Sequence, residues 1–332
     1  MRLRRIAGLG VVAVVVLASR AGANGQTPGS LLVYPEFDHT AGRSTLLSVT
    51  NTNSEADSGP VRVEFVYING DPAPSALCTE FNATVTLTPS DTIAIFTGAQ
   101  NPNPQRGYVY AFAKDNFGRA ISFNWLIGDE LVLDAFSAFQ YSINAVVFRA
   151  VAPERALTDV DAGGSGDGIR DLDGVEYEMA PSKILIPRFT GQSALYQSEL
   201  VLIALTGGSA FTTRLDFLVY NDNEEAFSKT HLFRCWQKIS LSTLSPLFAQ
   251  TFLAQQTNDN PQEIVGAPSI ESGWIEIDGG IAFSTAASVV NPAFLAVLVE
   301  RTNALSGAEL SFELGKQDNG DLVLEGVALD AN

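Results

Sequence analysis

The chain has 332 residues and a formal net charge of −17, with 46% hydrophobic and 17% charged residues. This balance excludes an intrinsically disordered chain, which combines few apolar residues with high charge. The negative charge disfavours nucleic acids and anionic membrane surfaces as partners, because their phosphate groups would repel it. We therefore expect cations, neutral glycans or other surface proteins as partners. We expect no nucleic acid as a partner, and no membrane insertion after signal cleavage.

Residues 1–23 have the pattern of a secretory signal peptide. Arginines near the N-terminus precede an apolar run from Ile6 to Ala18, and Ala21-Gly22-Ala23 supplies the small residues of a cleavage site. The run is about 13 residues long, whereas a membrane-spanning helix needs about 20. We expect cleavage after Ala23, with an uncleaved anchor helix as the alternative. Losing the four Arg residues of this segment takes the formal charge from −17 to −21.

Residues 24–152 are predicted to form a first antiparallel β-sandwich domain of immunoglobulin-like type. Short segments rich in Val, Ile, Thr and aromatic residues are separated by turns of Gly, Pro, Asn and Asp. In Val61–Phe65 apolar and polar residues alternate, which predicts one face in solvent and one on a core. About seven such strands favour two packed sheets. The predicted strands are Leu31–Phe37, Thr45–Thr50, Val61–Ile68, Ala83–Leu87, Thr92–Phe96, Tyr108–Ala113 and Ala120–Trp125.

The Asp- and Gly-rich segment 153–181 is predicted to link this domain to the next. Alternating carboxylates on a glycine-rich loop resemble calcium loops, because Ca²⁺ takes 6–8 oxygen ligands. The resemblance is partial, since no register places acids at all the required positions, and a solvated flexible linker is the alternative. The tentative Ca²⁺ ligands are Asp159, Asp161, Asp167, Asp171 and Asp173.

Residues 182–332 repeat the first domain, so we expect a second β-sandwich that arose by internal duplication. Arg62–Val66 returns as Arg214–Leu218, and Tyr34–Phe37 returns as Ile186–Phe189, with the same spacing. A period this long indicates a duplicated domain, because each copy is large enough to bury its own core.

The two cysteines, Cys78 and Cys235, are interpreted as corresponding residues of the two copies. Corresponding positions in tandem domains normally lie far apart, and a disulfide needs Cα atoms within about 7 Å. We therefore favour two buried thiols. A disulfide between the domains is the main alternative, because exported proteins form disulfides, and metal binding or intermolecular pairing is a third possibility.

Patterns of catalytic residues are sparse, and we predict that the protein is not an enzyme. The chain has two His residues outside any zinc motif, no nucleophile elbow and no phosphate loop. A carboxylate pair for glycoside hydrolysis is the alternative that the 37 acidic residues leave open. Aromatic residues that could form a platform for a sugar or peptide, and that are more typical of core packing, are Tyr108, Tyr110, Trp125, Trp236 and Trp274.

Six segments of the chain carry a resemblance to a known group, and they are Leu46–Thr52, Leu87–Thr92, Arg106–Ala111, Asn124–Asp129, Asp173–Glu178 and Tyr220–Glu225. Together they resemble a group of uncharacterised exported proteins of Gram-negative bacteria with tandem immunoglobulin-like repeats. The resemblance covers most of the mature chain and implies no activity. The sequence thus predicts a secreted, non-catalytic structural or adhesive protein of the bacterial periplasm or cell surface, with a carbohydrate-binding protein or a secreted hydrolase as the alternative.

Overall fold

A computed structural model describes residues 27–70, 78–103, 105–135, 139–160, 166–256, 270–302 and 306–322. Of these described residues, 59% lie in strands and 9% in helices, so this part of the chain is all β. None of the helices in the described ranges is long and apolar enough to cross a membrane. The all-β prediction is therefore confirmed.

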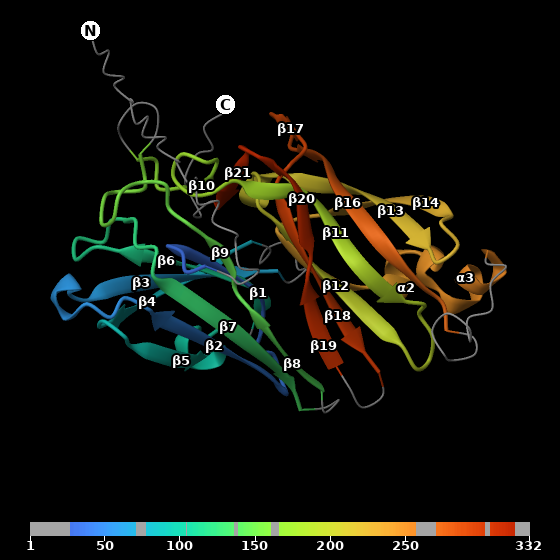
Figure 1. The fold of residues 1–332 in the computed structure, drawn as a ribbon, viewed down its shortest axis with the longest axis horizontal. Coiled ribbons are helices and arrows are strands. Elements are labelled where there is room, and N and C mark those ends of the chain that lie inside the picture. The colour runs from blue at the N-terminus through green and yellow to red at the C-terminus, as the bar shows by residue number, and fades with distance from the viewer. Residues whose placement is uncertain are drawn as a thin grey trace, which may run out of the picture.

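The first half of the chain forms two antiparallel sheets, which occupy the blue-to-green side of Figure 1. Sheet I has the strand order β5-β2-β7-β8, and sheet II has the order β4-β3-β6-β1-β9. A short helix, α1 (Thr97–Gln100), follows β5. The strands are β1 (Leu31–Asp38), β2 (Arg43–Asn51), β3 (Val61–Asn69), β4 (Glu80–Leu87), β5 (Thr92–Phe96), β6 (Arg106–Lys114), β7 (Leu126–Asp134), β8 (Phe139–Asn144) and β9 (Val146–Phe148).

The second half forms two further sheets. Sheet III has the order β15-β12-β18-β19, and sheet IV has the order β14-β13-β16-β11-β20 with β17 paired to β16. Helices α2 (Leu241–Leu244) and α3 (Gln250–Gln256) follow β15. The strands are β11 (Ala180–Thr190), β12 (Gln197–Ala204), β13 (Thr212–Asn221), β14 (Ala226–Phe233), β15 (Trp236–Ser240), β16 (Ser272–Phe283), β17 (Ser288–Val290), β18 (Phe294–Arg301), β19 (Ser306–Leu310) and β20 (Phe312–Gln317).

The repeated sequence has a counterpart in the strand order. Each strand of sheets I and II has an equivalent in sheets III and IV, in the same sheet position. Even an irregularity repeats: the pairing of β1 with β6 shifts between Tyr34 and Phe37, and the pairing of β11 with β16 shifts between Ile186 and Phe189. In both places the intervening residues begin with Pro, which cannot donate a ladder hydrogen bond.

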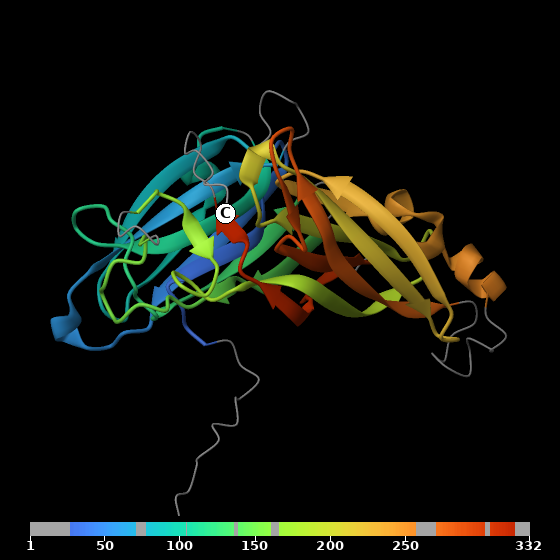
Figure 2. The same ribbon diagram turned by 90° about the horizontal axis from the view of Figure 1, so that it is seen from above.

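The four sheets are arranged as the blades of a four-bladed β-propeller. Successive sheets enclose three buried apolar clusters, one between sheets I and II, a second between II and III, and a third between III and IV. Sheets II and III are therefore buried on both faces. Figures 1 and 2 show the two halves side by side, in contact along this middle layer. The prediction of two tandem β-sandwich domains of immunoglobulin type is wrong.

The middle layer explains the error. In β3, Val63 and Phe65 face the first cluster, while Val66 and Ile68 face the second. The alternation in Val61–Phe65 therefore does not mark a solvent-facing side, and the buried Glu64 pairs with Lys114. Local alternation reports which residues share a face, and it does not report what covers that face.

One expected strand is absent from the structure, and a neighbouring segment forms a strand that was not expected. Ala120–Trp125 forms no strand, and only Ala120 and Ile121 make isolated bridges. The strand of this region is β7, which begins at Leu126. It includes acidic residues, which are uncommon in strands.

Cys78 and Cys235 form a disulfide, with their Cα atoms 5.9 Å apart. The favoured prediction of two free thiols is wrong because the assumed correspondence is wrong. Cys78 precedes β4, so its equivalent lies in the turn before β14, whereas Cys235 follows β14. Non-equivalent residues of two repeats packed side by side come within bonding distance, and the bond joins the two halves of the molecule.

In each half of the molecule, one glycine lies where two strands approach each other closely. Gly107 of β6 pairs with Asn69, and Gly273 of β16 pairs with Asn221. A Cβ atom at either position would overlap a backbone carbonyl, that of Ile68 or Tyr220.

We expect Gly107→Ala or Gly273→Ala to lower the free energy of unfolding by about 2 kcal/mol, because a backbone carbonyl must move to admit the methyl group. Gly307→Ala is the matched control, since a Cβ there meets nothing within 4 Å. Urea denaturation of the three variants checks this, and equal losses at all three sites would contradict the close-approach explanation.

Candidate functional site

The predicted calcium ligands that the structure describes lie in a segment packed against the body of the molecule. Within it β10 (Arg170–Leu172) pairs with β21 (Gly320–Leu322), and Leu172 and Tyr177 belong to the middle apolar cluster. Asp159 pairs with Arg170 at 3.0 Å. Asp167 accepts the Ile169 N–H.

The remaining predicted ligands are also placed by this segment. Asp173 accepts the Val175 N–H at 2.7 Å and the Glu176 N–H at 3.1 Å. Asp171 faces Asp321 in the β10–β21 register, and Asp161 lies outside the described residues. Among the described residues no group of three or more His, Cys, Asp or Glu side chains is placed to hold a metal ion. Calcium at this segment stays a prediction.

Burial perturbs two acids here. Desolvation raises the pKa of Glu176 to about 8, against hydrogen bonds from the Val160 and Asp171 N–H groups. Desolvation, together with the nearby Asp171 and Asp167 carboxylates, raises the pKa of Asp321 to about 7, although Asp321 accepts the Gly207 N–H. Both groups hold a proton in the folded protein at a pH where the unfolded chain has lost it.

The stability of the protein should therefore fall as the pH rises. A carboxyl group with a raised folded-state pKa stabilises the fold fully below its unfolded pKa, near 4, and this contribution is lost as the pH rises to 7–8. The loss is at most about 1.4 kcal/mol per pH unit for each group. We expect the melting temperature to be higher at pH 5.5 than at pH 8.

Asp321→Asn tests this expectation, because Asn keeps the acceptor oxygen for Gly207 and cannot ionise. Melting temperatures between pH 5 and pH 8.5 should fall less steeply for this variant than for the wild type. Asp57→Asn, on an exposed turn, controls for the loss of one formal charge. An unchanged slope in Asp321→Asn would exclude Asp321 as a source of the pH dependence.

A second polar cluster lies where the two halves meet. Glu36 sits in the β1 bulge and is 2% exposed. Lys238 of β15 donates to both of its carboxylate oxygens at 2.9 Å, and the Tyr141 hydroxyl donates to Oε2. Glu199 lies 3.7 Å from the same ammonium group. Burial lowers the pKa of Lys238, but the negative charges of Glu36 and Glu199 raise it by more. The pKa of Lys238 is therefore raised overall.

Glu130 completes this cluster from β7. It is fully buried, and its Oε2 accepts the Glu36 N–H at 3.1 Å. Burial raises its pKa well above the usual range, and Oε1 has no hydrogen-bond partner among the described residues. The equivalent position in the second half is Leu298, because Glu130 pairs with Leu47 as Leu298 pairs with Leu200. The cluster joins the halves and is largely buried, which is typical of a structural ion pair.

A carboxylate pair lies at the far end of the second half, beyond β13 and before β16. Asp222 and Glu271 are within hydrogen-bonding reach of each other. Burial, and then Asp222, raise the pKa of Glu271 to about 7. Gln250, at the start of α3, accepts the Glu271 N–H at 2.9 Å. This pair was not predicted from the sequence, because its two members are 49 residues apart and each follows an ordinary turn signal.

The proposed aromatic platform does not form as a unit. Tyr108, Tyr110 and Trp236 are buried in the middle cluster. Trp125 is 41% exposed, and Trp274 stacks on Tyr220 with ring centroids 4.0 Å apart on the outer face of sheet IV. Core packing, the alternative interpretation of these residues, holds for three of the five.

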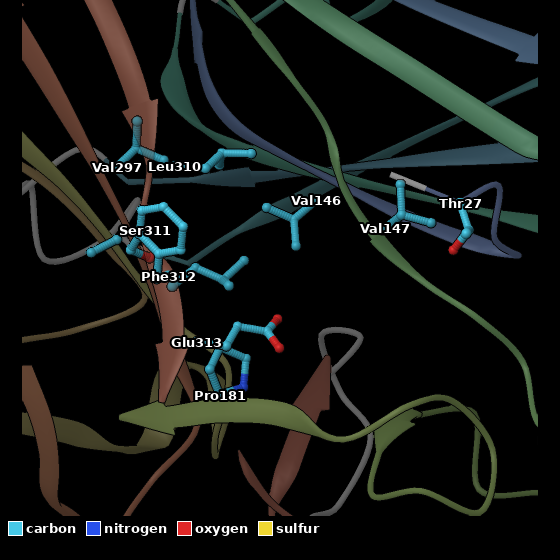
Figure 3. A pocket seen from close by; sticks show the side chains of 11 residues that line it. Thr27, Val146, Val147, Pro181, Val297, Leu310, Ser311, Phe312 and Glu313 are labelled. Atoms are coloured by element: carbon cyan, nitrogen blue, oxygen red, sulfur yellow. The ribbon is translucent and has the colours of Figure 1, made fainter. Parts of the chain in front are cut away.

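One cavity opens between the halves. Its volume is about 450 Å³, and its lining comes from β9, β11, β18 and the β19–β20 connection. Val146, Leu310 and Phe312 contribute apolar side chains, and Glu313 is the charged group of the lining (Figure 3). The cavity therefore lacks the set of converging polar groups that orients a polar substrate.

The chain matches no protein-family model, and a search of curated proteins finds no match. Function must therefore be argued from the geometry of the molecule.

Proposed function

We propose that this is an exported, non-catalytic structural or adhesive protein of the bacterial periplasm or cell surface. The signal-peptide pattern of residues 1–23 supports export. The Cys78–Cys235 disulfide supports an oxidising compartment, where such bonds persist.

The observation that carries the structural role is the way in which the two halves are fastened together. They share an apolar layer that draws residues from sheets II and III, a disulfide that crosses it, and the buried ion pair of Glu36 with Lys238. Trp236 adds a hydrogen bond from its indole N–H to the Pro35 carbonyl at 2.9 Å. Such a body is suited to hold its two ends at a fixed separation.

The outer faces of sheets I and IV carry polar residues. The equivalent positions in sheets III and II lie inside the molecule and carry apolar residues. On sheet IV, Lys183 pairs with Glu276 at 2.6 Å and with Asp278 at 3.3 Å. The pairing registers make these three residues equivalent to the buried residues Leu31, Tyr110 and Phe112 of sheet II.

Sheet I differs from sheet III in the same way. Ser48, Thr50 and Asp129 stand where sheet III has the buried residues Val201, Ile203 and Val297. Polar outer faces of this kind suit contact with solvent and with a hydrated partner.

The carboxylates of the molecule also favour a non-catalytic role over a glycoside hydrolase. Retaining and inverting glycosidases hold their two carboxyl groups about 5 Å or more apart, with substrate between them. Asp222 and Glu271 are within hydrogen-bonding reach of each other, and Glu271 is 1% exposed. Glu36 and Glu130 are buried, and the backbone N–H of Glu36 donates to the carboxylate of Glu130.

The test expresses the full chain in a Gram-negative host and then examines the purified mature protein. We expect mature protein outside the cytoplasm with both cysteines resistant to thiol labelling, binding to cells, matrix proteins or an array of glycans, and no turnover in a broad hydrolase panel. Heat-unfolded protein is the control for non-specific binding. Retention in the cytoplasm would overturn the export proposal, and turnover abolished by one carboxylate substitution would overturn the non-catalytic role.

A further inference from the structure

Glu271, the buried member of the pair, differs from the other buried acids described above because neither of its carboxylate oxygens has a hydrogen-bond donor among the described residues. Both oxygens of the Glu271 carboxylate and Oδ1 of Asp222 are inaccessible to solvent and without a hydrogen-bond partner among the described residues. Glu271 as a whole is 1% exposed. An ionised carboxylate in such a place loses its hydration without replacement, which is costly unless a cation or a proton compensates it.

Among the residues that the structure describes, no basic side chain forms an ion pair with either carboxylate. Within the described ranges, the ion pairs of Lys and Arg residues involve other acids. The sequence that precedes Glu271, residues 257–269, contains no Lys, Arg or His. The buried acids of the other clusters contrast with this, since Glu36 has Lys238 and Asp159 has Arg170.

The charge pair is specific to the second repeat. The Gly191 N–H donates to the Glu271 carbonyl as the His39 N–H donates to the Gln105 carbonyl, so Glu271 is equivalent to Gln105. Asp222 follows Asn221 as Gly70 follows Asn69, and the two Asn residues hold the same place opposite Gly273 and Gly107. The scaffold therefore folds without these carboxylates in one copy, and a structural need does not explain both of them in the other.

Two further polar groups at this place lack partners. Asn221 is 3% exposed and has an unpaired Nδ2, while its Oδ1 accepts the Asn223 and Glu225 N–H groups. Gln250 has an unpaired Nε2, while its Oε1 accepts the Glu271 N–H. The amide orientations follow from these bonds, so the unpaired atoms are donors. Donors of this kind suit water molecules that complete the shell of a bound ion.

We propose that Asp222 and Glu271 bind a divalent cation, with Ca²⁺ the ion that best suits their oxygen ligands. The two carboxylates offer up to four hard oxygen atoms, and Ca²⁺ accepts carboxylates in one- or two-oxygen contact and completes its shell with carbonyls and water. Binding requires both carboxylates to be ionised, so it displaces any proton that they share. The site is distinct from the Asp-rich segment 159–173.

Terbium luminescence tests the proposal directly, because Tb³⁺ occupies calcium sites and emits when a nearby Trp or Tyr is excited. Trp274 is three residues from Glu271, and Tyr220 is two residues from Asp222. At pH 7.5 we expect sensitised emission from the full mature chain that added Ca²⁺ suppresses, and a Ca²⁺-dependent rise in melting temperature. Trp274→Phe should reduce the emission and leave the Ca²⁺-dependent melting shift in place.

Glu271→Gln and Asp222→Asn should each weaken Tb³⁺ and Ca²⁺ binding at least tenfold. A variant with Asn at Asp159, Asp171 and Asp173 is the matched control, and it should keep the response. Circular dichroism verifies that the variants fold. If the control variant loses the response while Glu271→Gln keeps it, the ion binds at the Asp-rich segment and the proposal fails. If no response exists and Glu271→Gln raises the melting temperature at pH 8, the pair shares a proton instead, and the proposal fails.

Discussion

Replacing Cys78 and Cys235 together by Ser is expected to lower the free energy of unfolding by about 3–5 kcal/mol. The bond closes a loop with a sequence separation of 157 residues, and the chain-entropy model assigns the largest stabilisation to long loops. The bond also joins the two halves next to the apolar layer that they share, where Trp236 covers Gly70. Its loss should therefore weaken the junction before it weakens either half.

Urea denaturation of the double variant, and of the wild type with and without reductant, measures this effect. Reduced wild type should match the double variant, which separates the loss of the bond from any effect of the serines. Limited proteolysis should then show cleavage in the segments that connect the halves. Equal stability of oxidised and reduced protein would show that the apolar layer alone holds the halves together.

Lys238→Met is expected to lower the free energy of unfolding by about 3 kcal/mol, the second largest effect. The substitution keeps the apolar stem and removes the ammonium group that donates to both oxygens of Glu36. Glu36 is 2% exposed and would remain as a buried carboxylate that still accepts a hydrogen bond from the Tyr141 hydroxyl. Removing one member of a buried ion pair leaves an uncompensated charge, which is more harmful than removing both.

The double variant Glu36→Gln/Lys238→Met should therefore be more stable than Lys238→Met alone. Lys316→Met is the matched control, because its pair with Glu313 is more than a third exposed on both sides and such pairs contribute little. Thermal unfolding of the four proteins measures these differences. A Lys238→Met variant as stable as Lys316→Met would mean that the cluster does not fasten the halves.

Most strands could be predicted from the sequence, because their segments are rich in β-formers and are bounded by strong turn residues. β1, β3, β5 and β6 lie where expected, within two residues at each end. β7 was missed, because the acidic residues Asp129, Glu130 and Asp134 obscure its pattern. Glu130 in particular occupies a core position that the second copy fills with Leu298. The residues next to Glu130 in the sequence do not predict that it is buried.

The candidate sites could be predicted less well. The Asp-rich segment is conspicuous in the sequence, yet the described acids there are engaged by Arg170 and by backbone N–H groups. The pair Asp222–Glu271 is inconspicuous, because its members come from separate turns and meet only when β13 and β16 align. A motif search detects ligands that are close in sequence, and this pair is close only in space.

The amino-acid sequence by itself determined the β class, the duplication and the places of most strands, since composition, turn residues and repeated segments are local properties of the chain. Only the tertiary structure decided the four-bladed arrangement, the Cys78–Cys235 bond and the meeting of Asp222 with Glu271. The physical reason is that each of these depends on which sheet faces are covered and on which distant turns meet. The sequence around a residue does not predict which distant part of the chain will cover it.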